Sequence, residues 1–490
     1  MGSAEYGDAA GLAAELHRVL KLTGDVVAAS PGANELVDRV TGHVGVPLAS
    51  LVLVGRAWEA WEHANLQRGV DAYLAERGTE PDWFGIAGGQ RGHEELLGML
   101  AMSRRHVMYE LGAVDFATTA IGPEEATEVV QLGLIRTTAP DGTPVVLGVR
   151  GANPQYGLQE CRLEVVTADR AVATATRERI EVLMAEHDVL RGQVMAFGIS
   201  ENRGNELLTF LPRPKLRDED VVLPDGVLDS IERHTVGIAR HGERLLAAGQ
   251  HLKRGLLLHG PPGTGKTHTV RYLMGRLPEC TVVVLTGTAM QFVQKAATLA
   301  RRLQPSVVVL EDVDLIAQDR GHGLMGSSPL LFTLLDAMDG VGGDADVTFL
   351  LTTNRASELE RALADRPGRV DLAVEIPLPD AVGREALLRL YARGVKLTGD
   401  LAPIVEATEG VTASFAKELL RRAALLSLAE RPDEDIVVGD DELAGALQEM
   451  QDARSSLTRS LLGSAPEGPG EQFPVGGQFA RAVPAVQKFP

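Results

Sequence analysis

The most constraining stretch of this sequence is a glycine-rich octapeptide near the middle of the chain, Gly260-Pro261-Pro262-Gly263-Thr264-Gly265-Lys266-Thr267. It matches the pattern G-x-x-x-x-G-K-[ST] at every fixed position, between a short apolar strand at 255–259 and a helix that starts at His268. Glycines let the backbone curl around a polyphosphate, and the helix start adds a favourable dipole. The pattern therefore predicts a phosphate-binding loop rather than a plain Gly/Pro turn. Residues 260–268 are candidates for nucleotide contact, with Lys266 on the β- and γ-phosphates and Thr267 on Mg²⁺.

A second apolar strand, at 306–310, ends in two acids, Glu311 and Asp312. Hydrolysis of Mg·ATP requires one carboxylate that supports the water shell of the metal. It requires another that orients or deprotonates the attacking water. The alternative is an ordinary strand end with solvated acids, but the position after a phosphate loop favours the catalytic interpretation. We assign Glu311 to the metal and Asp312 to the water.

Two further polar groups follow in the chain. The strand at 347–353 ends in Asn354, which at a strand tip can hydrogen-bond the γ-phosphate or the water. Beyond it, Pro367-Gly368 separates Arg366 from Arg369. The chain has by then moved away from its own phosphate loop, so the two arginines suit the site of a neighbouring subunit, where they would stabilise transition-state charge. The alternatives are a turn asparagine and a solvated arginine pair.

These motifs, in this order and spacing, resemble those of the AAA family of ring ATPases. The resemblance rests on 260–267, Glu311-Asp312, Leu335-Asp-Ala-Met-Asp-Gly340, Thr352-Thr-Asn354 and Arg366-Pro-Gly-Arg369. It implies that Lys266 and Thr267 take the Walker A roles, that Asn354 is sensor 1, and that Arg366 and Arg369 are paired arginine fingers. It also implies a hexamer that binds ATP and Mg²⁺ at subunit interfaces and couples hydrolysis to remodelling of a macromolecule.

Two features depart from the family pattern. The acids are reversed, because the family usually reads Asp-Glu. The mitochondrial AAA translocases of the Rieske-protein type look similar in this order, so we expect slow but real turnover. The first pore loop is short: only 286–293 separates its strand from the body of the next helix. Phe292 is its one aromatic residue, and two interpretations stay open, a substrate contact or a helix core residue. The loop at 321–328 lies where the family has its second pore loop.

The predicted fold class is multidomain α/β. A parallel-sheet ATPase domain at 220–378 carries a helical lid at 379–453. A mostly helical segment at 1–105, with one helix over 57–76, and a small α+β module at 106–211 precede it, joined by a linker at 212–219. Asp141-Gly142 predicts a hairpin, and strands at 193–199 and 206–211 complete the module. Residues 454–490 are rich in Gly, Pro and Ser and are predicted to be disordered.

Composition limits the partners. The net charge of -19 disfavours a broad nucleic-acid surface, so nucleic acid is not an expected partner. Cys161 and Cys280 are too few for a disulfide framework or a cysteine zinc site. No apolar run approaches the ~18 residues of a membrane span, and residues 1–15 lack the pattern of a secretory signal. We therefore expect a cytoplasmic protein without a membrane partner, acting on a protein through residues 1–211 and the central pore.

The sequence supports an Mg²⁺-dependent ATPase that remodels a macromolecular partner. A rival from another class is a nucleotide-gated scaffold or switch, in which ATP binding orders a ring and hydrolysis is residual. The reversed acids and the short pore loop favour this rival, whereas Asn354 and the arginine pair argue against it. A metabolic kinase fits poorly, because the paired arginines and the lid helices have no place in one.

Overall fold

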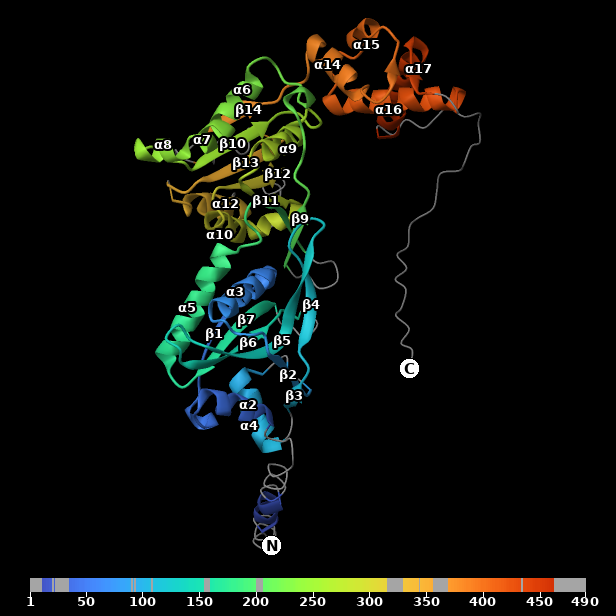
Figure 1. Cartoon of the computed structure of the whole chain (residues 1–490). Coiled ribbons are helices and arrows are strands. Elements are labelled where there is room, and N and C mark those ends of the chain that lie inside the picture. The colour runs from blue at the N-terminus through green and yellow to red at the C-terminus, as the bar shows by residue number, and fades with distance from the viewer. Residues whose placement is uncertain are drawn as a thin grey trace, which may run out of the picture. The chain divides into compact units, whose positions relative to one another are not determined.

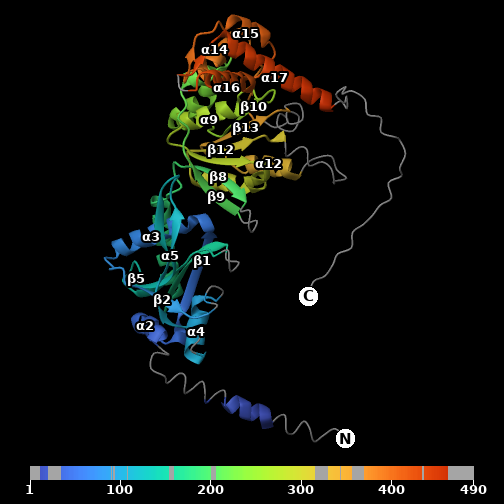
Figure 2. The same ribbon diagram turned by 90° about the vertical axis from the view of Figure 1, so that its right-hand side faces the viewer.

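The chain divides into two compact units, residues 1–378 and 379–490 (Figures 1 and 2). The computed structural model describes residues 11–19, 22, 35–89, 91, 94–106, 109–153, 159–199, 206–314, 329–342, 344–355, 369–432 and 435–461. Within the first unit two separate β-sheets follow each other along the chain, each covered by helices on both faces (Figure 1).

The first sheet belongs to an N-terminal α+β module. Its strands lie in the order β1-β7-β6-β5-β2-β3, and β4 pairs with β5. The bounds are β1 Val52–Glu59, β2 Trp83–Ala87, β3 Glu110–Gly112, β4 Asp115–Ala120, β5 Ala126–Thr138, β6 Pro144–Arg150 and β7 Glu160–Thr167. Helices α3 and α5 pack on one face of this sheet, and α2 and α4 pack on the other. Their bounds are α2 Glu35–Val44, α3 His63–Glu76, α4 Leu96–His106 and α5 Arg170–Glu186, with short 3₁₀ turns η1 Leu48–Ser50 and η2 Ala60–Glu62.

Local sequence explains much of this module. The hairpin predicted around Asp141-Gly142 is confirmed as β5–β6, and Gly142 takes a φ of 88°, which glycine adopts without strain. Helix α5 begins where the carboxylate of Asp169 accepts hydrogen bonds from the backbone N–H groups of Ala171 and Val172.

The predicted division at residue 105 was wrong. Strands β1 and β2 come from the supposedly helical segment, yet they lie in one sheet with β5, β6 and β7. The predicted helix over 57–76 begins only at His63, because Val52–Glu59 pairs antiparallel with β7 over its whole length. Periodicity within one segment cannot reveal a strand whose partner lies about 100 residues further along the chain.

The second sheet is the parallel sheet predicted for the ATPase domain. Its strands lie in the order β14-β10-β13-β12-β11-β8-β9, and all pairs are parallel except β8–β9. The bounds are β8 Val194–Ile199, β9 Glu206–Leu211, β10 Arg254–His259, β11 Thr281–Thr286, β12 Ser306–Glu311, β13 Val347–Thr353 and β14 Leu372–Glu375. The central strands are almost continuous apolar runs buried on both sides, as a sheet covered on both faces requires.

Helices cover both faces of the parallel sheet. α10 and α12 pack on one face, and α6, the π-helical turn η5 and α9 pack on the other. The bounds are η4 Asp218–Asp220, α6 Val227–Glu232, η5 Arg233–Gly237, α7 Ile238–Arg240, α8 Gly242–Ala247, α9 Lys266–Arg276, η6 Gly287–Phe292, α10 Val293–Arg302 and α12 Pro329–Asp339.

Strands β8 and β9 are not part of the module to which the sequence analysis assigned them. β8 pairs parallel with β11, and β9 pairs antiparallel with β8, so both extend the sheet of the ATPase domain. The segment predicted as a linker is fixed as well: the Arg213 guanidinium donates to four backbone carbonyls, those of Gly192, Met274, Leu277 and Cys280. The ATPase sheet therefore recruits chain from residue 194 onward.

A charge cluster with two buried carboxylates and an exposed arginine joins the module to helix α10. Arg302 donates to both carboxylate oxygens of Glu62 at 3.1 and 2.6 Å and lies 3.4 Å from Asp188. The side-chain amide of Asn65 donates to both acids, at 2.8 and 2.9 Å. Burial raises the pKa of Glu62, and Arg302 opposes this shift. We call Glu62, Asn65, Asp188 and Arg302 the Arg302 clamp.

An aromatic row runs beside the clamp. The Trp61 ring meets the Phe197 ring edge-on at 5.4 Å between centroids, and Phe197 lies 5.9 Å from Phe292. Lys295 of α10 lies over the Trp61 ring and pairs with Glu59 at 3.0 Å. These rings thus pack the N-terminal module (Trp61) against strand β8 (Phe197) and against the end of η6, just before α10 (Phe292).

The second unit is a set of helices with a two-stranded parallel sheet, β15 Lys396–Leu397 and β16 Val437–Val438. Its helices begin within the segment predicted as a helical lid: α14 Ala381–Tyr391, α15 Ala402–Ala407, α16 Ala413–Glu430 and α17 Asp440–Leu461. Asp380 and Thr412 cap the starts of α14 and α16. Helix α17 continues past the predicted end at residue 453, and residues 462–490 of the predicted tail lie outside the described residues.

In the described parts of the chain, no helix combines the length and the apolar character needed to cross a bilayer.

The two cysteines are expected to be chemically inert in the folded protein. Cys161 and Cys280 are 0% and 4% exposed, and burial raises their pKa values to about 12 and about 11. At pH 8 only about one thiol in a thousand or fewer would be the reactive thiolate. Labelling with a chromogenic disulfide should be at least ~100-fold slower in buffer than in denaturant. Rapid labelling of the folded chain would contradict this packing.

Removing Arg302 is expected to destabilise the first unit. Arg302→Ala leaves two buried carboxylates without their cation, which should cost about 3 kcal/mol, the low end for a broken buried pair because Arg302 is 39% exposed. The folded-state pKa of Glu62 is raised, so the free energy of unfolding falls as pH rises through that value. Without Arg302 to oppose the shift, the destabilisation caused by Arg302→Ala should be larger at pH 8, where Glu62 is charged, than at pH 5. Denaturant unfolding measures both effects.

The control is Lys295→Ala on the same helix. Its pair with Glu59 is 41% and 42% exposed, so its loss should cost less than about 1 kcal/mol, with little pH dependence. Equal costs for the two variants would contradict a special role for the Arg302 clamp.

Candidate functional site

The glycine-rich loop has the backbone shape that a phosphate cradle requires. Gly260, Gly263 and Gly265 adopt φ values of 137°, 80° and 113°, which L side chains rarely adopt. A Cβ on Gly260 would lie 2.3 Å from the backbone oxygen of Ile376, the residue after β14, so this glycine allows close approach of the two backbones. Unlike α5, α14 and α16, helix α9 has no side-chain cap at its start. Its first N–H groups are therefore available to an anion.

The loop side chains fall into a buried and an exposed set. Lys266 is 5% exposed and donates from Nζ to the carbonyls of Gly260 and Pro261 at 2.9 and 2.8 Å. Thr264 is buried and donates to Pro261 at 2.9 Å, whereas Pro261, Pro262 and Thr267 are exposed. Burial lowers the pKa of Lys266, and Asp312 and Asp314 act against this shift. The lysine is thus held in the loop and faces the acids of β12.

His268 has a structural partner. Its Nε2 donates to the backbone carbonyl of Asp220 at 2.9 Å. This contact joins the start of α9 to η4, the turn that precedes α6.

The two acids predicted after β12 lie in different environments. Glu311 is the last residue of the strand and half-buried; burial and then Asp312 raise its pKa, while Arg271 lowers it. Asp312 is exposed, and its φ is 54°. It is the one non-glycine residue with positive φ in the part of the chain that the structure describes. Aspartate tolerates this left-handed conformation better than most residues, at a cost of about 1 kcal/mol. Its N–H donates to the buried hydroxyl of Thr352 at 2.9 Å, which holds the turn.

Asn354, which follows β13, lies beside Asp312, which follows β12. The side-chain amide of Asn354 donates to Asp312 Oδ1 across a long distance of 3.4 Å, and Asn354 is exposed. The structure therefore brings Lys266, Glu311, Asp312 and Asn354 to one edge of the parallel sheet.

Asp314 is a residue that the sequence analysis missed. It is 5% exposed and accepts from the hydroxyl of Thr353 at 3.2 Å and the backbone N–H of Asn354 at 3.3 Å. Its carboxylate thus fixes the turn that carries Asn354. The third acid of the Glu311-Asp-Val-Asp314 run was the available signal, but a buried structural carboxylate and a solvated one look alike in a sequence.

The arginine pair is only partly visible. Arg366 lies outside the described residues. Arg369 is 5% exposed and makes a bidentate pair with Asp339, with distances of 3.0 and 2.6 Å. Its backbone packs on β10, because a Cβ on Gly255 would lie 2.0 Å from the Arg369 carbonyl oxygen. Any action of Arg369 on a neighbouring subunit would therefore require this pair to open.

Of the two predicted pore segments, only the first, at 286–293, lies among the described residues. Phe292 is partly buried, packs on the core of the ATPase domain and contacts Phe197, so in this chain it has the core role of the two interpretations. Residues 321–328 lie outside the described residues. In the second unit, Lys417 lies 6.0 Å above the Tyr391 ring and helps to line a cavity of about 410 Å³.

The described residues fit a Mg·nucleotide. An uncapped helix start and a glycine cradle suit phosphates, and Lys266 supplies a cation between them and the acids. Thr267 and Glu311 offer the hard oxygens that Mg²⁺ prefers. The raised pKa of Glu311 reflects a carboxylate whose burial and acidic neighbour a bound cation would offset.

Asp314 is expected to position Asn354 without binding nucleotide itself. Asp314→Ala removes the acceptor of two hydrogen bonds, so turnover should fall about tenfold or more while ATP affinity stays within about twofold. Asp314→Asn keeps an oxygen acceptor and should retain most turnover. Steady-state kinetics with nucleotide titration separates the two quantities. Full turnover in Asp314→Ala would exclude the positioning role.

Comparison with known proteins finds one matching family and several similar enzymes. A family model described as "ATPase family associated with various cellular activities (AAA)" matches residues 256–378. The ATP-dependent zinc metalloprotease FtsH of Thermus thermophilus is 32% identical over 279 residues, 54% of this chain and 44% of that protein. FtsH of Mycobacterium tuberculosis is 31% identical over 255 residues, 49% of this chain and 33% of that protein.

The chain spans less than half the length of these relatives. Among the side chains that the structure describes, no three of His, Cys, Asp and Glu are grouped so as to hold a metal ion. The family model nevertheless covers most of β10, all of β11 to β14 and every predicted nucleotide residue from Gly260 to Arg369. Residues 256–378 of the chain therefore match the AAA family of ATPases.

Proposed function

We propose that this protein hydrolyses ATP with Mg²⁺ and uses the energy to remodel a protein partner. The observation that carries the proposal is the convergence of Lys266, Glu311, Asp312 and Asn354 at one edge of the parallel sheet, beside an uncapped helix start. Relatives named as ATP-dependent enzymes support it.

Each side chain has a distinct task in an in-line attack of water on the γ-phosphate. Residues 260–268 hold the phosphates, and Lys266 neutralises charge on them. Thr267 and Glu311 would hold Mg²⁺, which when bound would draw charge from the phosphate oxygens. Asp312 accepts a proton from the attacking water or orients it, and Asn354 fixes the Asp312 carboxylate.

Turnover is expected to be slow. Asp312 is one methylene shorter than the glutamate usual at this place, so the water must lie closer to the backbone. The left-handed backbone of Asp312, held by Thr352, sets the direction of this shorter carboxylate.

Arg366 and Arg369 complete the site of the next subunit in a ring, which we propose to be hexameric. An arginine supplied in this way stabilises the charge of the transition state. To reach the neighbouring site, Arg369 must break its bidentate ion pair with Asp339 of the same chain, which costs free energy. Asp339 therefore competes with the neighbouring nucleotide for Arg369.

The work of hydrolysis reaches the partner through the N-terminal module. Phe292, the aromatic residue of the first pore segment, is packed against Phe197 instead of being free to grip a threaded chain. The Arg302 clamp ties the module to α10, the helix that follows this segment. Movement of α10 is thereby transmitted to residues 35–190, where we place the contact with the partner.

The rival function is a nucleotide-gated switch with residual turnover. The reversed acids and the packed Phe292 favour it. Dependence of turnover on assembly separates the two, because a motor needs its neighbour's arginine for each cycle, whereas a switch needs only bound ATP.

The decisive experiment is ATP hydrolysis measured against protein concentration. Wild-type activity per subunit should rise with concentration as rings form. Asp312→Asn should lower turnover at least ~100-fold, and Arg369→Ala should lower it by a similar factor at saturating ATP. Lys266→Ala should lose ATP binding. Asp344→Asn, an exposed acid before the opposite end of β13, is the matched control and should behave as wild type.

The outcomes are distinct. Wild type that binds ATP yet is no more active than Lys266→Ala at any concentration would replace the motor with the switch. Asp312→Asn with normal turnover would refute the assigned base. If Asp339→Asn, which keeps the shape of the Arg369 partner, matches Arg369→Ala, then Arg369 acts within its own chain.

A further inference from the structure

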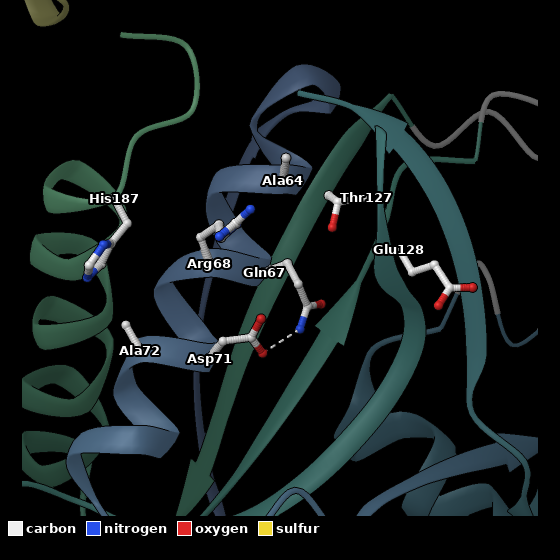
Figure 3. Close-up of a pocket in the computed structure, with 8 residues that line it drawn as sticks. All are labelled: Ala64, Gln67, Arg68, Asp71, Ala72, Thr127, Glu128 and His187. Atoms are coloured by element: carbon white, nitrogen blue, oxygen red, sulfur yellow. Dashed lines mark hydrogen bonds between the residues drawn. The ribbon is translucent and has the colours of Figure 1, made fainter. Parts of the chain in front are cut away.

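A cavity of about 440 Å³ in the N-terminal module lies far in sequence from the nucleotide loop (Figure 3). One face of helix α3 forms its wall over two turns, and the start of β5 and the residue after α5 complete it. Its size lies within the range of small-molecule sites. The lining residues are Ala64, Gln67, Arg68, Asp71, Ala72, Thr127, Glu128 and His187.

Gln67 gives this cavity a fixed frame. It is 8% exposed, and its Oε1 accepts from the backbone N–H of Val130 at 2.9 Å. Its Nε2 donates to Asp71 Oδ1 at 2.8 Å, the dashed contact in Figure 3. His63, one turn earlier, donates from Nε2 to the carbonyl of Val130 at 2.9 Å. The bonds of His63 and Gln67 thus join helix α3 to strand β5 at Val130. The Gln67 amide also fixes the position of one Asp71 carboxylate oxygen.

The second oxygen of Asp71 is left for another donor. Burial raises the pKa of Asp71, and Gln67 and Arg68 only partly oppose the shift. Asp71 is an exposed residue, so this second oxygen is accessible to a cationic ligand.

The charged groups around the cavity are of both signs. Asp71 and Glu128 are carboxylates on facing elements, and Arg68 is a guanidinium one residue from Gln67 (Figure 3). Within the described residues, Arg68 and Glu128 make no side-chain hydrogen bond or ion pair. The cavity therefore offers two anions and one cation, with small alanine side chains between them. A ligand that matches this balance carries two cations and one carboxylate.

We propose that this cavity binds a basic amino acid, with its carboxylate on Arg68 and its cationic groups on Asp71 and Glu128. The same chemistry, a carboxylate beside a basic side chain, occurs in the free amino acid and in the C-terminal residue of a peptide. The two sources differ in the α-amino group, which is charged in the first and an amide in the second.

The test is calorimetric titration of the full-length chain with three probes. L-Arginine carries all three charges, agmatine lacks the carboxylate, and N-acetyl-L-arginine lacks the α-ammonium. L-Arginine should bind wild type with a Kd of about 1 mM or tighter. Asp71→Asn keeps the bond to Gln67 but loses the charge. It and Glu128→Gln should each weaken L-arginine about tenfold.

Arg68→Gln should weaken L-arginine about tenfold and leave agmatine unchanged, which a merely structural effect would not do. Glu124→Gln, an exposed acid in the β4–β5 turn outside the cavity, is the matched control and should bind as wild type. Because N-acetyl-L-arginine lacks one of the two cations, it should bind at least ~10-fold more weakly, which assigns the free amino acid. Equal binding would assign a peptide C-terminus and refute the contact of an α-ammonium with a cavity carboxylate.

Two results would overturn the proposal. One is no binding of either L-arginine or N-acetyl-L-arginine to wild type at about 10 mM. The other is binding that Asp71→Asn and Glu128→Gln leave unchanged, since the ligand would then lie elsewhere. Unfolding midpoints of all variants, expected within about 2 °C of wild type because the changed side chains are exposed, exclude a folding defect.

Discussion

The parallel pairing of β10, β13 and β12 is the constraint on which the ATPase site depends. Leu258 lies opposite Thr352, and Leu310 lies opposite Leu351, so the three strands end at one edge. Neighbouring strands are about 4.8 Å apart, and this spacing sets the separation of the groups that follow them. The ladder continues into the turn, where Val313 and Asp312 donate to the backbone and side chain of Thr352. Catalytic placement is therefore a property of the sheet, more than of any one loop.

The sequence predicted this region well because its signals are local. The loop glycines, the acids after β12 and Asn354 each follow an apolar strand by a fixed number of residues, and parallel strands bring such ends together. Other features depend on distant partners. Nothing near Val194 says that it pairs with β11 rather than with its own module. The burial of Arg369 depends on Asp339, thirty positions earlier, and on Gly255 beneath it.

The same limit applies to side chains that serve as frames. Asp314 and Gln67 each hold another residue's active atoms in place, and both are buried. The clamp and the cavity of the module share two backbone segments. Ala64 and His187 line the cavity, whereas their chain neighbours Asn65 and Asp188 belong to the Arg302 clamp. The cavity and the Arg302 clamp are therefore adjacent along the chain both at the start of α3 and just after α5.

The placement of β8 and β9 also limits how this protein can be divided or can have been assembled. β11 would be the outer strand of the ATPase sheet if the chain began after residue 211, with a row of unpaired N–H and C=O groups. The strands that cover this edge are themselves continuous with helix α5 of the module. Cutting the chain at the apparent linker would thus leave β11 as an unpaired edge strand that is prone to aggregation. The module and the ATPase domain are therefore best expressed and studied as one polypeptide.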